Sequence, residues 1–155
     1  MTTTLTSEQI QHALLAVADV LIANKEELTT LDAELGDGDL GRTVSRGFAA
    51  IKEKLAAGDT VDADVGKMLF KNGKEFSNSA PSSFGALFGT VLMTSGKSLR
   101  GNESVPLSAI ADAAQDALEA LMERGKANIG DKTMLDAMQP AIEAMRTSIT
   151  DNGDG

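Results

Sequence analysis

Apolar residues recur at helical spacing along most of this 155-residue chain, in seven stretches separated by turns rich in glycine, serine or proline. This periodicity predicts helices over residues 7–23, 25–35, 43–55, 63–78, 84–99, 106–123 and 133–149. Thr6 and Gln9 fit a capping box at the start of the first helix. The chain has five Phe but neither Tyr nor Trp, which favours close-packed helices over aromatic-rich sheets. The predicted fold is all-α, an antiparallel helical barrel or bundle.

Length and charge restrict the possible functions. The length suits a single domain over residues 1–155, of which the last five are expected to fray. A formal charge of −9 argues against a protein that tracks a nucleic-acid backbone, because such a protein needs a basic face. The chain has no cysteine, which favours a reducing compartment, and its apolar runs are too short to span a membrane. We expect a cytoplasmic protein with no nucleic-acid or membrane partner.

The segment from Leu31 to Thr43 gathers three carboxylates where one helical pattern stops and the next begins. Asp32, Asp37 and Asp39 can converge only if the chain bends sharply, and glycine permits such a bend at positions 36, 38 and 41. Oxygen ligands without cysteine or a nearby histidine favour Mg²⁺, Mn²⁺ or Ca²⁺ over zinc. The alternative interpretation of this segment alone is a capped turn with solvated aspartates.

Three turns rich in glycine or serine each precede a predicted helix, at residues 36–43, 80–83 and 125–132. Pairs of helices separate these turns, so in an antiparallel bundle all three lie at the same end. They would form one rim that combines carboxylates for metal with helix N-termini and serine hydroxyls for phosphate. Small residues beside an apolar surface would leave room for a nucleotide base. His12, the only histidine, lies off the apolar stripe of its helix and is interpreted as a surface residue.

Three ordered motifs in this sequence resemble a known family. Asp32, Asp37 and Asp39 stand in the pattern D-x4-D-G-D-x-G, which Arg46-Gly47-Phe48 follows; APSSFG occupies residues 80–85 and RGKANIGDKTMLD residues 124–136. In this order and at these separations the motifs closely resemble the nucleotide-binding L subunit or domain (DhaL-like) of dihydroxyacetone kinases. The resemblance covers nearly the whole chain.

That resemblance implies an antiparallel eight-helix barrel, of which about six to seven helices are present here. It also implies ADP or ATP at one end, with the phosphates bridged by two Mg²⁺ ions held by Asp32, Asp37 and Asp39. The implied nucleotide contacts fall into three groups, which follow the phosphates, the next stretch of the nucleotide and the adenine: Leu40, Gly41, Arg42 and Thr43; Ser82, Ser83 and Phe84; and Gly125 and Met134.

The function implied by the resemblance is that of a kinase subunit, active only with a partner. A phosphoryl group would pass to a small ketose or polyol held by a separate K subunit (DhaK-like), on a histidine that this chain does not contain, so no catalytic residue is assigned here. The phosphoryl donor would be ATP, or a phosphocarrier protein of the phosphotransferase system that rephosphorylates bound ADP. The sequence leaves both donors open, and it leaves open a homo-oligomer.

Departures from the family pattern keep other functions open. Many members have His where this chain has Leu40, and some have a more glycine-rich turn at residues 80–85, which indicates a divergent branch. The family continues for roughly two more helices, including a lid over the nucleotide, so a barrel open on one side is expected here. A regulatory or adaptor module that docks a kinase subunit or a transcription factor is the main alternative. A helical domain merely stabilised by metal is another.

Overall fold

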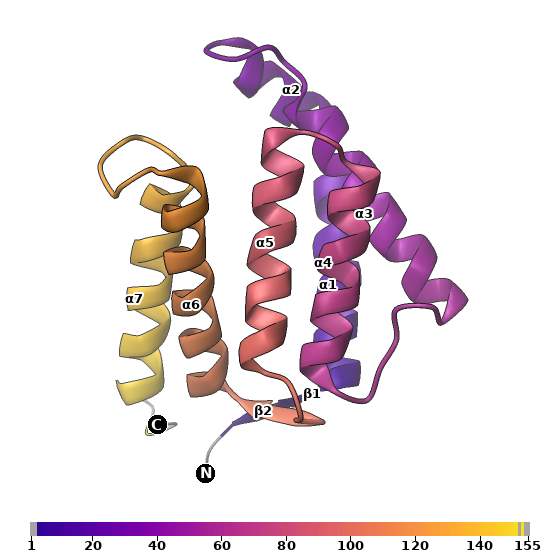
Figure 1. The fold of residues 1–155 in the computed structure, drawn as a ribbon, viewed down its shortest axis with the longest axis vertical. Coiled ribbons are helices and arrows are strands. Elements are labelled where there is room, and N and C mark those ends of the chain that lie inside the picture. Colours follow the sequence, from indigo (N-terminus) through magenta and orange to yellow (C-terminus); the bar gives the residue numbers. More distant parts are fainter. Residues whose placement is uncertain (1–2, 152, 154–155) are drawn as a thin grey trace.

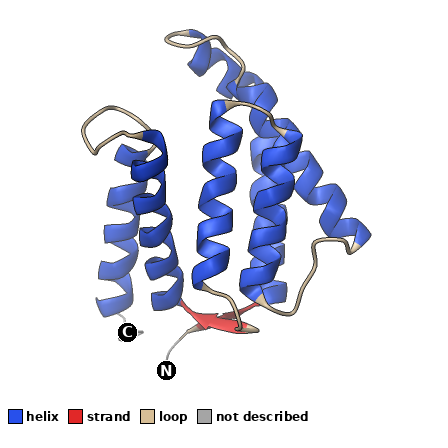
Figure 2. Ribbon diagram, in the orientation of Figure 1, coloured by secondary structure: helices blue, strands red, loops and turns tan. Residues whose placement is uncertain are grey.

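The computed structural model describes residues 3–151 and 153, and most of them are helical (Figures 1 and 2). Of the end expected to fray, residues 152, 154 and 155 lie outside the described residues. The elements are β1 (Thr4–Thr6), α1 (Ser7–Ala23), α2 (Lys25–Ala33), α3 (Leu40–Ala57), α4 (Val65–Ser79), α5 (Ser83–Ser98), β2 (Ser104–Pro106), α6 (Leu107–Gly125) and α7 (Leu135–Asp151). The prediction of an all-α fold is confirmed. Within the described part, no helix is long and apolar enough to cross a membrane.

Local sequence signals explain most helix boundaries. The capping box predicted at the start of α1 is present, with the Thr6 hydroxyl accepting from Gln9 N and the Gln9 side chain accepting from Thr6 N. By contrast, α3 begins at Leu40, three residues earlier than predicted. The carboxylate of Asp32, eight residues upstream, accepts a hydrogen bond from Leu40 N at 3.1 Å and so caps this helix. Because the capping carboxylate belongs to α2, the hydrophobic periodicity of α3 itself does not show where α3 begins.

A short antiparallel ladder joins β1 and β2, with Leu5 opposite Val105, and the sequence pattern did not predict it. Pro106, expected inside the first turn of its helix, precedes that turn with an extended backbone (φ −70°, ψ 156°). Strands of three residues are too short to show a period-two pattern. The ladder joins the start of α1 to the start of α6, and the buried Val105 fixes it to the core.

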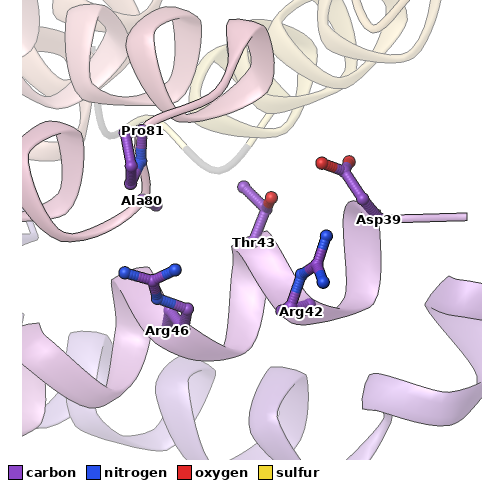
Figure 3. Close-up of a pocket in the computed structure, with 6 residues that line it drawn as sticks. All are labelled: Asp39, Arg42, Thr43, Arg46, Ala80 and Pro81. Atoms are coloured by element: carbon purple, nitrogen blue, oxygen red, sulfur yellow. The ribbon is translucent and has the colours of Figure 1, made fainter. Parts of the chain in front are cut away.

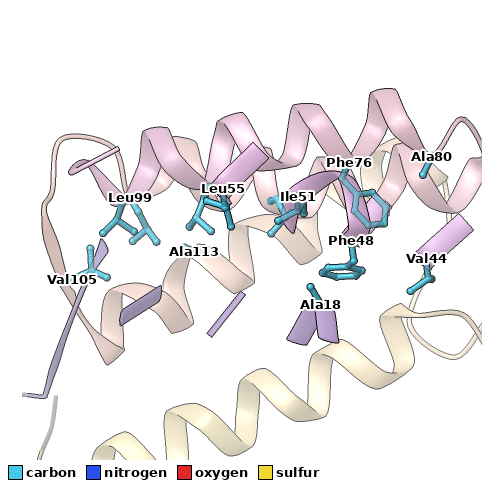
Figure 4. Packing of buried hydrophobic residues seen from close by; sticks show 13 residues of the cluster. Ala18, Val44, Phe48, Ile51, Leu55, Phe76, Ala80, Leu99, Val105 and Ala113 are labelled. Carbon is cyan, nitrogen blue, oxygen red and sulfur yellow. The ribbon is translucent and has the colours of Figure 1, made fainter. Parts of the chain in front are cut away.

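The three glycine- or serine-rich turns lie at one end of the molecule, as predicted, with the β1–β2 ladder at the other (Figure 1). The larger core cluster joins α1, α3, α4 and α5 around Phe48 and Phe76 (Figure 4). A second cluster joins α6 and α7 around Leu121 and Leu135. Helical spacing predicts an apolar stripe of Ile10, Leu14, Val17 and Leu21 on α1, and this prediction is wrong at Val17, which is 47% exposed.

Helices α4 and α5 approach so closely that glycine is required at their contact. A Cβ atom added to Gly73 of α4 would lie 2.9 Å from both Gly89 O and Met93 N of α5. One added to Gly66 would collide with Gly96 O. Because these neighbours are backbone atoms, the helices themselves would have to move apart. The close approach fixes the turn between α4 and α5, and with it the start of α5.

Gly73→Ala should therefore lower the free energy of unfolding by about 1–3 kcal/mol, the usual cost of overpacking. The matched control is Gly125→Ala, whose added Cβ atom would meet only Leu87 Cδ2, at 4.0 Å. This control should be neutral or slightly stabilising, since alanine favours helix. Urea denaturation of both variants measures the difference, and equal stabilities would contradict the proposed packing constraint.

Asp64 connects the start of α4 to the loop that follows α5. Its carboxylate caps α4 by accepting from Lys67 N at 3.0 Å and also accepts from Gly101 N at 2.9 Å. Burial tends to raise the pKa of Asp64, but these backbone N–H groups outweigh burial, so the pKa lies below its usual value. The ionised carboxylate thus stabilises the folded state.

Asp64→Ala should cost about 1–2 kcal/mol of unfolding free energy at neutral pH, as expected for loss of a helix cap. Since the folded-state pKa is lowered, this contribution is present above the unfolded-state pKa of about 3.9 and is lost as the pH falls through the folded-state pKa. Denaturation at pH 7 and below pH 4 should show the gap between wild type and variant closing in acid. Glu123→Ala, on an exposed site of α6, is the control and should change little at either pH.

Candidate functional site

Three aspartates converge at the turn between α2 and α3. Asp32 lies in the last turn of α2, Asp37 in the loop, and Asp39 directly before α3. One carboxylate oxygen from each lies within 4.8 Å of the others. The convergence predicted from the sequence is therefore confirmed as geometry. The backbone of the loop takes part, because Asp39 N donates to Asp37 Oδ1 at 3.3 Å.

Glycine shapes this loop in two different ways. Of the three glycines, only Gly38 has a positive φ, 72°, so the expectation that all three supply the bend in this way is wrong. At Gly36 a Cβ atom would lie 2.5 Å from Asp32 Oδ1, so a larger residue there would displace this carboxylate from its place in the cluster. Gly41 is needed because a Cβ atom there would collide with the carbonyl oxygen of Lys25 and the hydroxyl of Thr29. Gly41 therefore permits the close contact of α2 with α3 that brings Asp32 to Asp39.

The donor set of the three aspartates fits a hard divalent cation. Mg²⁺ binds oxygen at about 2.0–2.1 Å, so two oxygens on one ion are at most about 4.2 Å apart. The aspartates therefore need only small side-chain movements to share an ion. Among the ion pairs of the described residues, none involves Asp32, Asp37 or Asp39. Three carboxylates at this separation repel one another unless a cation compensates them.

The aspartates open onto a cavity of about 750 Å³. Two turns line this carboxylate cavity, which is formed by Asp32, Gly36, Asp37, Asp39, Leu40, Pro81, Ser82, Ser83 and Phe84. The N-termini of α3 and α5 both begin at its wall. The first N–H groups of a helix lack partners within that helix and carry partial positive charge, so the cavity combines carboxylates for a cation with N–H groups for an anion.

Phe84 ties the cavity to the core. Its ring stacks on Phe88 at a centroid distance of 5.9 Å, and Phe88 in turn packs against Phe76 at 4.7 Å and Phe48 at 5.4 Å. Ser82 caps α5 by accepting from Gly85 N at 3.0 Å, which leaves its hydroxyl proton free to donate. The start of α5 is thus held by both packing and capping before any ligand binds.

A second, smaller cavity of about 160 Å³ adjoins the first and shares Asp39 and Pro81 with it. Arg42, Thr43 and Arg46 of α3 face Ala80 and Pro81 across this arginine cavity (Figure 3). Arg42 and Thr43 were predicted as nucleotide contacts, whereas Arg46 was noted only as part of a motif. Its position one helical turn after Arg42 was the available signal.

The third turn lies at the same end of the molecule but lines neither cavity. Gly125 and Met134, the two predicted contacts on the adenine side, are therefore not lining residues of either cavity. It is organised internally by Asp136, which accepts from Gly130 N at 2.6 Å and Thr133 N at 2.8 Å. These N–H groups lower the pKa of Asp136. Lys126 and Lys132 adopt positive φ values of 50° and 59°, which side chains other than glycine seldom do. Gly41 also lines neither cavity, because it is buried against α2.

Fold and site together define an all-α domain with a carboxylate-lined cavity at the N-termini of two helices. The model of the DAK2 domain family matches residues 34–154, and this chain belongs to that family. It is 34% identical over 148 residues to the ADP-binding subunit DhaL of the PEP-dependent dihydroxyacetone kinase of Escherichia coli. That match covers 96% of this chain and 70% of the subunit.

Longer kinases contain a similar region. The chain is 36% identical to D-erythrulose kinase of Mycolicibacterium smegmatis and 37% identical to human triokinase/FMN cyclase, covering 90% of this chain and 24% of each of those proteins. Its fold matches the crystal structure of the dihydroxyacetone kinase of C. freundii in complex with AMP-PNP and Mg²⁺, with a TM-score of 0.80 and 23% identity, over 96% of this chain and 27% of that one. This chain thus corresponds to about a quarter of the longer kinases.

Gly41→Ala should weaken cation binding without altering any carboxylate. The added methyl group would push α3 away from α2 and separate Asp32 from Asp39, so we expect Mn²⁺ affinity to fall by about tenfold, as for other changes that misalign ligands. Mn²⁺ titration followed by electron paramagnetic resonance measures this. Ala49→Ser, on the exposed side of α3, is the control. Unchanged Mn²⁺ affinity in Gly41→Ala would refute the role given to this contact.

Proposed function

We propose that this chain is the nucleotide- and Mg²⁺-binding unit of a dihydroxyacetone-kinase-like phosphotransferase. The observation that carries the proposal is the convergence of Asp32, Asp37 and Asp39 on a cavity bounded by two helix N-termini. Kinship to subunits named for ADP binding adds support. Each structural feature then has a role in holding a phosphate chain.

In this proposal the three aspartates hold two Mg²⁺ ions, which would screen the phosphate charges and orient the terminal group for in-line transfer. The start of α3, from Leu40 to Thr43, would follow the phosphates. Leu40 N already donates to Asp32 and Thr43 N to Asp39 O, so the backbone donors of this turn that are left for a phosphate would be those of Gly41 and Arg42. At the start of α5, Ser82 and Ser83 supply hydroxyl donors, and Phe84 offers an apolar surface. Gly125 and Met134 belong to the adenine side, where the third turn would form a wall beyond the carboxylate cavity.

The acceptor of the phosphoryl group is proposed to be a small ketose or polyol presented by a separate K-like subunit. The relatives include kinases of dihydroxyacetone and of erythrulose. A ketose of three or four carbons is therefore the acceptor that these relatives support. Neither cavity has a histidine among its lining residues, so in this proposal the acceptor-binding histidine belongs to the partner subunit and this chain binds and positions the donor. The donor is ATP or, for bound ADP, a phosphocarrier protein of the phosphotransferase system.

Calorimetry with ADP in the presence and absence of Mg²⁺ tests the proposal. Asp37→Asn removes one negative ligand, so we expect Mg²⁺-dependent ADP affinity to fall about tenfold or more. Asp59→Asn is the matched control, because Asp59 lies just after the C-terminal end of α3, far from the three aspartates, and pairs there with Lys54. Absence of ADP binding by the wild-type chain, or equal affinity of the Asp37 variant, would refute the proposal. Mg²⁺-dependent ADP binding without phosphoryl transfer in the presence of a K-like partner would favour an adaptor role.

A further inference from the structure

The arginine cavity holds two cations that the protein itself leaves uncompensated. Arg42 and Arg46 lie one turn apart on the exposed side of α3. Within the described residues, neither guanidinium has a hydrogen-bond or ion-pair partner. Two like charges at this spacing repel each other slightly. Both side chains line one cavity, so a single anion bound there could pair with both of them.

A hydroxyl group without a partner in the described part of the chain also lines this cavity. Thr43 is only 6% exposed, and its hydroxyl has no hydrogen-bond partner among residues 3–151 and 153. Thr43 lies between the two arginines in the sequence and lines the same cavity (Figure 3). The guanidinium groups and this hydroxyl are all donors, which matches the oxygens of a phosphoryl group and not the face of a base.

The size and position of the cavity narrow the ligand further. A volume of about 160 Å³ is sufficient for one phosphoryl group and is much smaller than the carboxylate cavity. Asp39 and Pro81 line both cavities, so an anion here would lie directly beside the proposed metal site. A phosphate chain in the carboxylate cavity could extend into the arginine cavity by one group.

We propose that the arginine cavity is the subsite for the terminal phosphate of a nucleoside triphosphate, with Arg46 as the residue that distinguishes a triphosphate from a diphosphate. This inference rests on the proposed nucleotide-binding function. Arg46 donates to the terminal phosphate oxygens in this arrangement, and Arg42 and Thr43 bind the same group from the first turn of α3. A planar guanidinium can donate two parallel hydrogen bonds to a phosphate, which an ammonium group cannot reproduce.

The test compares the affinities of the full chain for AMP-PNP and ADP, both with Mg²⁺, by calorimetry. Arg46→Met should lower AMP-PNP affinity by about tenfold or more, as expected for loss of charge-assisted hydrogen bonds, and should leave ADP affinity within about twofold. Arg46→Lys should give an intermediate loss for AMP-PNP. Arg100→Met, an exposed arginine next to α5 at the ladder end, is the control and should change neither affinity.

The possible outcomes separate the two proposals. If wild-type protein binds neither nucleotide, the proposed function itself fails. If wild-type protein binds ADP with Mg²⁺ and Arg46→Met weakens ADP and AMP-PNP equally, or weakens neither, the terminal-phosphate subsite is refuted while the proposed function stands. Thermal unfolding of Arg46→Met should match that of the wild type, because the side chain is exposed and unpaired among the described residues.

Discussion

The candidate site depends on the close contact between α2 and α3. Because Gly41 has no side chain, the first turn of α3 packs directly against the backbone of Lys25 and the hydroxyl of Thr29. That contact places Asp32 where it caps α3 through Leu40 N and still faces Asp37 and Asp39. One carboxylate thus serves both the fold and the site. A change that displaces Asp32 would therefore disturb both the start of α3 and the cluster of three carboxylates.

The second wall of the carboxylate cavity is fixed by a different kind of contact. Gly73 and Gly89 allow α4 and α5 to meet backbone to backbone, and the phenylalanines run from Phe48 in the core to Phe84 at the cavity. Both devices hold the N-terminus of α5 without help from a ligand. A phosphate binding site built from helix N-termini needs such support, because the N–H groups stabilise an anion only when their direction is fixed.

The two arginines of α3 give this acidic protein a local positive surface beside its carboxylates. Opposite charges in adjoining cavities suit a metal–phosphate ligand, whose cations and anionic oxygens alternate along its length. The third turn is separated from both cavities and is ordered by its own hydrogen bonds to Asp136.

The sequence by itself determined the all-α class, the approximate helices, the common end of the three turns and the convergence of Asp32, Asp37 and Asp39. These features depend on local periodicity, turn chemistry and the parity of antiparallel helices, all of which are readable along the chain. Only the tertiary structure decided the early start of α3, the β1–β2 ladder, the exposure of Val17 and the pairing of Arg46 with the second cavity. The ladder, the exposure of Val17 and the second cavity depend on how elements distant in sequence are placed in space, and the start of α3 depends on the Asp32 carboxylate eight residues upstream. Hydrophobic periodicity along the chain does not report such placements.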